Sequence, residues 1–145
     1  MDNSVIIKSQ LVEAQVTGSV ATGRRYNFLD IPNLSRNNIV IYAIEALGYT
    51  QLKASPTGNA VLGSAATTDV SDQVVFTLVD TNNEQFIYQF PVYSAVRSNN
   101  PTGSILKVAP KLINLTACFI QLVDTSDIAV NQSQVFNIYY YEKSE

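Results

Sequence analysis

The sequence predicts an all-β domain: an antiparallel β-sandwich of about eight or nine strands, with a jelly-roll-like arrangement favoured over an immunoglobulin-like one. Three observations lead to this prediction. The hydrophobic runs follow a period of two, they are rich in Val, Ile, Phe, Tyr and Thr, and clusters of Gly, Pro, Asn and Asp separate them. Because 145 residues is the size of one ordinary domain, residues 1–145 are expected to form a single β-sandwich domain.

Two strands are expected before residue 30, over Val5–Val16 and Arg24–Leu29. The next apolar run, Ile39–Leu47, is the best candidate for a helix, but its apolar residues are continuous, β-branched residues begin it, and Gly48 ends it early. We therefore expect a strand there, with alternate side chains on opposite faces. The residues expected on one face are Val40, Tyr42 and Ile44, and those expected on the other are Ile39, Ile41 and Ala43.

The middle of the chain predicts a β-hairpin. After a short expected strand over Ala60–Leu62 and a loop or short helix over Ser64–Asp72, two period-two runs fill Asp72–Val96. The polar residues 81–83 between these runs are typical of a short turn. Pro91 lies in the returning run and has no N–H, so we expect that strand at a sheet edge or at a bulge.

The last third of the chain supplies three more expected strands, over Ile105–Val108, Lys111–Asp124 and Gln134–Glu142. No long helix is predicted anywhere in the chain. The single cysteine, Cys118, lies in an apolar run and is expected to be a small buried hydrophobic residue. The large side chains predicted to form the core are Phe76, Leu78, Phe119, Phe136 and Ile138.

The last expected strand contains three consecutive tyrosines, in the stretch QVFNIYYYE. Alternation directs Phe136, Ile138 and Tyr140 into the core. The other face carries more apolar area than a solvent-facing sheet needs, and tyrosine is enriched at protein interfaces. We therefore predict an interface with another subunit on this face, while cover by a loop of the same chain and a sugar-stacking platform stay open as alternatives. The predicted interface residues are Val135, Asn137, Tyr139 and Tyr141.

The composition excludes several classes of partner. Charged residues make up 14% of the chain, against about 25% in a typical domain, and the net charge is −3. Such a chain has no basic field to attract a phosphate backbone, so nucleic acid is not expected as a main partner. The longest uncharged apolar run, Leu112–Val123, is shorter than the roughly 20 residues of a membrane-spanning helix. No membrane insertion is therefore expected.

Catalysis is not expected either. The chain has no histidine, so it cannot form a Ser-His-Asp, Cys-His or His-metal site from its own residues. It also lacks the common phosphate-binding and nucleophile motifs. A pair of carboxylates among Glu13, Asp30 and Glu45 stays open as an alternative. We predict that the protein is not an enzyme and nominate no catalytic residue.

Three acidic loops, residues 69–72, 80–84 and 124–127, offer oxygen ligands of the kind that calcium takes. Asp, Asn, Ser and Thr are also the residues that turns favour, because their side chains bond to the local backbone. The turn role is the simpler interpretation. We therefore predict no metal site and no cofactor.

The absence of His and Trp, the Asn-rich turns, the scarce charge and the series of short strands resemble the small all-β virion proteins of bacteriophages. The resemblance implies a capsid, penton, decoration or fibre component that is located in the virion. Its partners would then be itself and other structural proteins of the assembly, and no small-molecule ligand is expected. We predict a structural assembly subunit of this kind. A β-sandwich module for carbohydrate or receptor binding, acting in adhesion, is the alternative.

Overall fold

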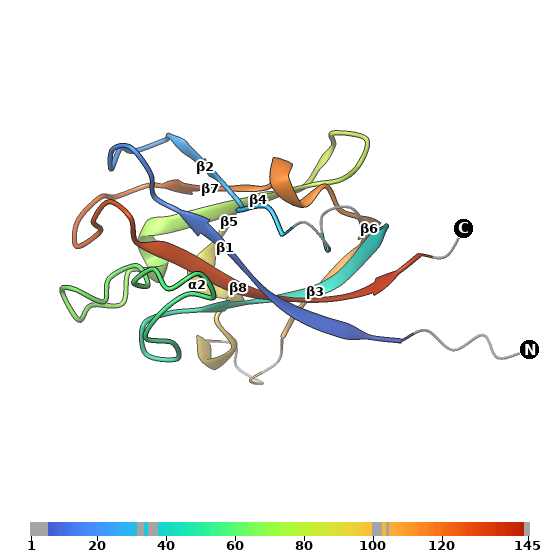
Figure 1. Ribbon diagram of the computed structural model, residues 1–145, viewed down its shortest axis with the longest axis horizontal. Helices are drawn as coiled ribbons and strands as arrows, with labels where there is room; N and C mark the ends of the chain where they lie inside the picture. The colour runs from blue at the N-terminus through green and yellow to red at the C-terminus, as the bar shows by residue number, and fades with distance from the viewer. Residues whose placement is uncertain (1–5, 32–33, 35–37, 100–102, 104, 144–145) are drawn as a thin grey trace, which may run out of the picture.

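The computed structural model describes residues 6–31, 34, 38–99, 103 and 105–143. Within these residues eight strands form two four-stranded sheets that pack face to face (Figure 1). The first sheet contains β1 (Lys8–Gln15), β8 (Ser133–Glu142), β3 (Ile39–Leu47) and β6 (Leu106–Leu112), in that order. The second contains β2 (Arg25–Asn27), β7 (Phe119–Leu122), β4 (Val74–Val79) and β5 (Gln85–Pro91). All neighbouring strands are antiparallel, so the predicted antiparallel β-sandwich is confirmed.

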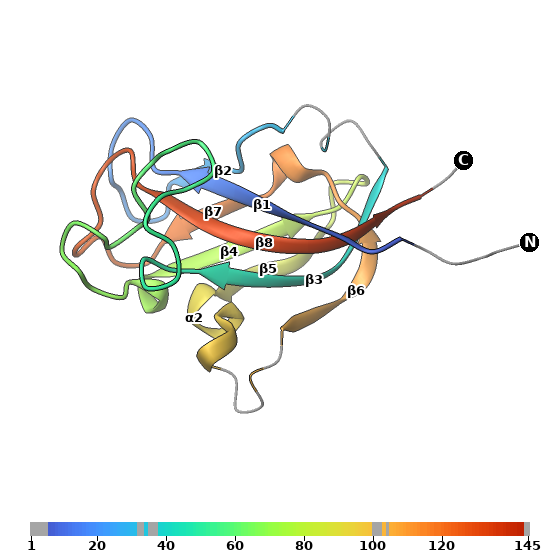
Figure 2. The ribbon, with the colours of Figure 1, turned by 60° about the horizontal axis from the view of Figure 1, so that its bottom comes forward.

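The strand pairs are nested along the chain. Strand β4 pairs with β5, β3 with β6, β2 with β7 and β1 with β8. The chain is thus arranged as one long antiparallel hairpin whose two arms stay side by side, while the β3–β8 and β4–β7 pairs join these nested pairs into sheets. Figure 2 shows β1, β8 and β3 side by side in the first sheet. The N-terminal end of β1 and the C-terminal end of β8 project together beyond the body of the sandwich.

The space between the sheets is filled by the side chains that the alternation predicts. Phe136 lies at its centre, where its ring stacks on Phe28 with 5.3 Å between centroids and meets Phe76 of the other sheet at 5.0 Å. Burial of these rings removes large apolar areas from water and stabilises the packing of the two sheets. All five residues predicted for the core, namely Phe76, Leu78, Phe119, Phe136 and Ile138, are buried, and Cys118 is buried as predicted.

A β-bulge in β3 corrects the predicted faces of that strand. The register of β3 against both β6 and β8 shifts between Ile41 and Ala43. Before the shift Ile39 and Ile41 lie in the core, and after it Ile44 and Ala46 do. The prediction that Ile44 shares a face with Val40 is therefore wrong, because a bulge adds one residue and reverses the alternation beyond it. Without the bulge, strict alternation from Ile41 would direct the Glu45 carboxylate into the core.

The hairpin is confirmed, but its second strand is shorter than predicted. Strand β5 ends at Pro91, and a helical turn, α2 (Val92–Ala95), follows in place of the predicted strand to Val96. Strand β5 lies at the edge of the second sheet, as the missing N–H of Pro91 predicts. It is also bulged: Gln89 has a φ of 46° and its N–H donates to the hydroxyl of Thr77 at 3.2 Å.

Two further boundaries differ from the prediction. The expected strand Lys111–Asp124 is divided, because Lys111 and Leu112 continue β6 and a 3-10 turn, η3 (Leu115–Ala117), precedes β7. This run contains no Gly or Pro, so nothing in its pattern reveals the turn. The segment Ala60–Leu62 forms only isolated bridges, and the only helical element within Ser64–Asp72 is the start of a 3-10 turn, η1 (Ser71–Gln73). No helix in the described part of the chain is long and apolar enough to cross a membrane.

Candidate functional site

The predicted interface residues share the outer face of the first sheet, the face turned away from the second sheet. Their neighbours Phe136, Ile138 and Tyr140 lie in the core, so Val135, Asn137, Tyr139 and Tyr141 alternate onto the opposite side. The register places Asn137 between Leu11 of β1 and Glu45 of β3. Val135 lies between Glu13 and Leu47 in the same way.

The end of the outer face that contains Val135 is covered by the protein itself. Val135 is 0% exposed, although β8 presents it on the outer face. The backbone N–H of Thr57 and the side-chain amide of Asn59 donate to the carboxylate of the adjacent Glu13, at 3.2 and 3.3 Å, and Val61 forms a bridge to Ser133. The loop between β3 and η1 therefore crosses this end of the sheet. The prediction that Val135 contacts another subunit is corrected, because its own chain buries it.

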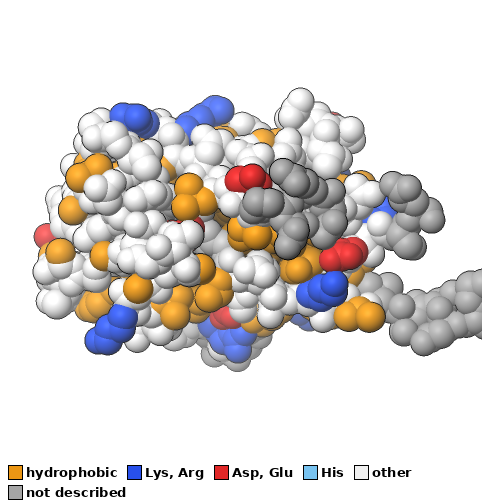
Figure 3. Space-filling model, viewed as in Figure 1, with side chains coloured by type: hydrophobic (Ala, Val, Ile, Leu, Met, Phe, Trp, Pro, Cys, Tyr) orange, Lys and Arg blue, Asp and Glu red, His pale blue; other side chains and the backbone are white. Residues whose placement is uncertain are grey.

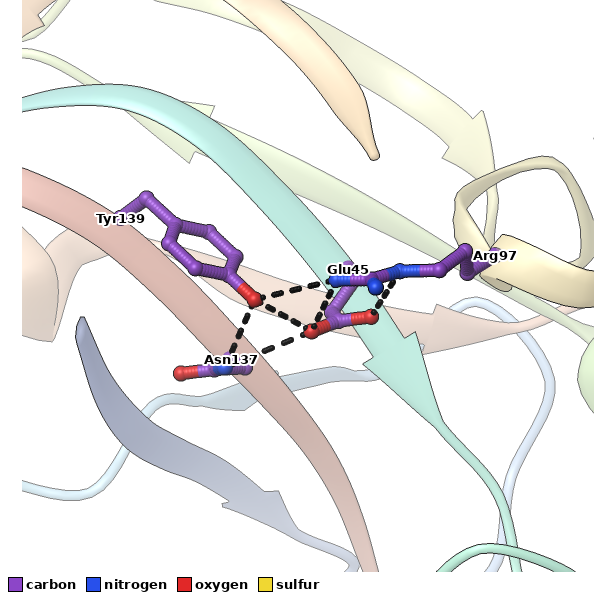
Figure 4. Close-up of polar contacts among 4 residues, drawn as sticks. All are labelled: Glu45, Arg97, Asn137 and Tyr139. Carbon is purple, nitrogen blue, oxygen red and sulfur yellow. Dashed lines mark hydrogen bonds and ion pairs between the residues drawn. The ribbon is translucent and has the colours of Figure 1, made fainter. Parts of the chain in front are cut away.

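A polar network occupies the middle of the outer face (Figure 4). The hydroxyl of Tyr139 donates to Oε1 of Glu45 at 2.6 Å, and the side-chain amide of Asn137 donates to that hydroxyl at 3.1 Å. Arg97, from the 3-10 turn η2 (Arg97–Asn99) after α2, holds the other carboxylate oxygen with its Nε at 3.1 Å. We call Glu45, Arg97, Asn137 and Tyr139 the Glu45 network.

The Glu45 network compensates a charge that is largely buried. Glu45 is only 8% exposed, and a carboxylate at that depth is costly unless it is paired and hydrogen-bonded. Arg97 supplies the opposite charge, while its side chain stays 47% exposed. Burial and the hydrogen bond to Glu45 raise the pKa of Tyr139 further above neutrality, which fits its hydroxyl acting as the donor to Glu45. The ring of Tyr139 is thereby fixed in place, with the ring of Tyr42 at 6.4 Å.

A surface hollow of about 430 Å³ lies beside the Glu45 network. Its walls combine the charged Glu45 and Arg97 and the polar Gln51 and Ser98 with the apolar Ala46, Leu47 and Val96. The sequence indicated Glu45 as an acid among apolar residues, but it gave no signal for Arg97. Only the fold shows that the turn after α2 returns to β3, where Ala46 and Val96 form a bridge.

Tyr141 has different surroundings from Tyr139, although the two share a face. It pairs with Val40 at the start of β3 and lines a second hollow of about 400 Å³ near the β4–β5 turn. Lys111 and Lys143 also line this hollow. Tyr139 and Tyr141 both remain partly exposed, so they stay available for the contact predicted for them.

The other acidic residues do not assemble around the Glu45 network. Glu13 and Asp30 line a third hollow of about 200 Å³ at the opposite edge of β8. In the acidic loops Asp69, Asp80 and Asp124 each accept a hydrogen bond from a backbone N–H two residues later, the turn role expected for them. Among the described residues no group of three or more His, Cys, Asp or Glu side chains could hold a metal ion.

No protein-family model matches the chain, and no curated protein or solved structure is significantly similar to it. The features of the protein that bear on its function are therefore the strand arrangement, the outer face and the composition of the surface.

Proposed function

We propose that the protein is a structural assembly subunit that acts through protein–protein contacts, most specifically a capsid or capsid-associated protein of a bacteriophage virion. The observation that carries this proposal is the nested pairing of the eight strands. We infer that this order, β1-β8-β3-β6 facing β2-β7-β4-β5, is that of a jelly roll. Jelly rolls are frequent in viral capsid proteins and also occur in lectins and cupins, so the fold supports the proposal by analogy.

The surface supports the same proposal. Figure 3 shows a face on which few charged side chains are scattered among uncharged polar and hydrophobic ones. Dispersed charges keep free monomers soluble and apart, and this chain has few of them. A subunit with permanent neighbours has less need of such charges.

The partly exposed half of the outer face is the proposed contact surface. Tyr139 is held by Glu45 and Asn137, so it loses little conformational freedom when a partner covers it. Tyr141 adds a second amphipathic ring on the same face. Rigid tyrosines of this kind supply large contact area at low entropic cost.

A β-sandwich module for glycan or receptor binding is the second candidate. The hollow of about 430 Å³ beside Glu45 and Arg97 favours it, because that volume lies within the range of small-ligand sites and combines apolar walls with two charged groups. The two candidates differ in their behaviour without ligand. An assembly subunit associates by itself, whereas a binding module stays monomeric and retains a glycan or peptide.

Native mass measured across a concentration series tests the proposal. We expect the wild-type mass to rise with concentration, and we expect a Tyr139→Ser, Tyr141→Ser double variant to associate more weakly while its far-UV circular dichroism is unchanged. The matched control is the double variant Tyr88→Ser, Tyr93→Ser. It removes two exposed tyrosines from β5 and α2, which do not belong to the outer face of the first sheet, and it should associate normally. A wild type that is monomeric throughout would refute the assembly function. A double variant that associates normally, or that unfolds, would refute the contact surface.

A further inference from the structure

We propose that β1 pairs with β1 of a second copy, antiparallel and across a two-fold axis at Ser9, so that two first sheets join into one continuous sheet of eight strands. This inference rests on the proposed function, because it specifies one contact by which assembly subunits would meet. It concerns the edge of the first sheet and does not involve the side chains of Tyr139 and Tyr141.

The other three sheet edges in the described part of the chain are protected against strand addition. Strand β2 has only three residues. Strand β5 contains Pro91 and is bulged at Gln89. Strand β6 contains Pro110 between two lysines, Lys107 and Lys111. Short length, proline, bulges and lysine are the features by which proteins prevent edge-to-edge pairing. Strand β1 has eight residues and no proline, and its register with β8 is unbroken.

At odd-numbered residues in the N-terminal half of β1, the backbone groups are directed to the side away from β8, where Leu11 lines a hollow together with Leu29 and Ile31. The carbonyl of Glu13 accepts the N–H of Leu29, which lies on the side of β1 away from β8. Val16 exchanges bonds with Asn131 and Gln132 on the β8 side. Because backbone groups alternate along a strand, Ser9 and Leu11 direct their N–H and C=O groups away from β8. Among the described residues, no backbone group on that side bonds to Ser9 or Leu11. The carbonyl of Leu11 does accept one hydrogen bond, from the side-chain amide of Gln10.

The register of the proposed β1–β1 pair is decided by which backbone N–H and C=O groups of β1 are available for bonding. In an antiparallel pair across a two-fold axis, the axial residue faces its own copy. An axis at Leu11 would place Ser9 opposite Glu13, whose carbonyl is already bonded to Leu29. An axis at Ser9 makes Ser9 face Ser9 of the copy and Ile7 face Leu11 of the copy. This register uses only groups that have no backbone partner among the described residues.

The side chains are compatible with the same register. Ile7 and Leu11 would form two apolar cross-strand pairs, and Ile7, which is 51% exposed in the single chain, would become covered. Lys8 would face Gln10 of the copy, so no like charges oppose each other. The ammonium group of Lys8 also contacts Glu142 of its own chain at 3.0 Å, so it is directed toward β8 and does not guard the free edge.

Proline at position 9 tests the edge without removing a bond inside the chain. Ser9→Pro deletes an N–H that points away from β8, and proline is tolerated at such edge positions. We expect Ser9→Pro to keep the wild-type circular dichroism spectrum and melting temperature but to lose the dimer in sedimentation experiments from micromolar to millimolar concentration. The matched control, Ser9→Val, keeps the N–H and should keep the dimer. If the wild type associates and Ser9→Pro associates equally well, the edge proposal is wrong while the assembly function stands.

Disulfide trapping decides the register even if Ser9→Pro fails to fold. Facing residues of a hydrogen-bonded antiparallel pair have Cα atoms about 5.5 Å apart, within the range of about 4.4–6.8 Å that a disulfide spans. Ser9→Cys should therefore form a covalent dimer under mild oxidation. Lys8→Cys is the control, because diagonal neighbours lie about 7–8 Å apart and cannot be bridged without movement. Cys118 is buried, so the native thiol does not interfere. Equal cross-linking of both variants, or none of Ser9→Cys, would overturn the proposed pairing.

Discussion

Replacing Phe136 by alanine removes the ring that joins the two sheets at the centre of the core. Phe136 is fully buried on β8, an interior strand of the first sheet, and its ring contacts both Phe28 and Phe76. Truncating a buried phenylalanine to alanine costs about 3–5 kcal/mol through lost burial and the cavity that remains. That range already includes lost ring contacts, and the two aromatic pairs of Phe136, each worth about 0.5–1.5 kcal/mol beyond area, place its cost in the upper part of the range. We therefore expect about 4–5 kcal/mol, which is a large share of the roughly 5–15 kcal/mol that stabilises a domain.

Urea unfolding measures this cost directly. The chain has eight tyrosines and no tryptophan, so tyrosine fluorescence or far-UV circular dichroism reports the transition. We expect a lower midpoint with an unchanged slope, because the folded and unfolded states expose nearly the same surface as in the wild type. The melting temperature should fall by roughly 12–20 °C, at about 3–4 °C per kcal/mol for a domain of this size.

A matched variant makes the result decisive. Phe90→Ala also removes a ring next to Phe76, at 5.8 Å, but Phe90 lies on the edge strand β5 and is only half-buried. We expect it to cost about 1–2 kcal/mol, since much of its burial term is absent. If Phe136→Ala costs no more than Phe90→Ala, the assignment of Phe136 to the centre of the core is refuted.

Three further predictions follow from individual residues. Burial acts to raise the pKa of Glu13, but hydrogen bonds, including those from Thr57 and Asn59, lower it more. The stability that Glu13 contributes is therefore present above its unfolded pKa of about 4.3 and is lost as the pH falls through the lower folded value. Glu13→Gln should make the melting temperature depend less on pH below about pH 5. A variant whose melting temperature depends on pH as strongly as that of the wild type would contradict this. Gly63 and Gly23 have similar φ values, +83° and +80°, but only at Gly63 would a Cβ meet a backbone atom, the Thr68 carbonyl oxygen at 2.2 Å. Gly63→Ala should thus destabilise more than Gly23→Ala, which costs about 1–2 kcal/mol for the left-handed backbone alone, and equal melting temperatures would disprove the close approach. Burial raises the pKa of the Cys118 thiol to about 12, so a thiol reagent at pH 8 should label the protein only when it unfolds, and rapid labelling of the folded protein would show that Cys118 is accessible.

The sequence predicts the strands better than it predicts the interruptions between them. The period of two identifies the faces of β4 and β8, because both strands run without a bulge through their core residues Phe76 and Phe136. The bulge in β3 leaves no mark in the run Ile39–Leu47, since nearly every residue there is apolar and either register buries hydrophobic side chains. The helical turn after Pro91 is hidden because it is only four residues long, too short to show a helical period, and only Val92 and Ala95 of it are buried.

The candidate site is predictable only in part. The alternation correctly placed Asn137, Tyr139 and Tyr141 on a common face, because β8 is regular. It could not show that the loop after β3 buries Val135, since loops that return to a sheet leave no periodic signal. Arg97 lies 52 residues from Glu45 in the sequence, and an ion pair over that separation depends on the path of the chain.

The outer face is divided by these contacts into two halves that have different roles. At the end near Val135 the protein's own loop covers the sheet and bonds to Glu13, so that half is already an interior surface. Beyond that half, from the middle of the face onward, Tyr139 is partly exposed, and its register partner on β1 is Ser9, the residue at the centre of the proposed edge contact. Two-fold pairing at Ser9 would therefore place Tyr139 of each copy on the same face, separated only by the two β1 strands. The proposed edge contact would thus join two separate exposed areas into one continuous surface that carries tyrosines from both copies, the residue type that interfaces enrich.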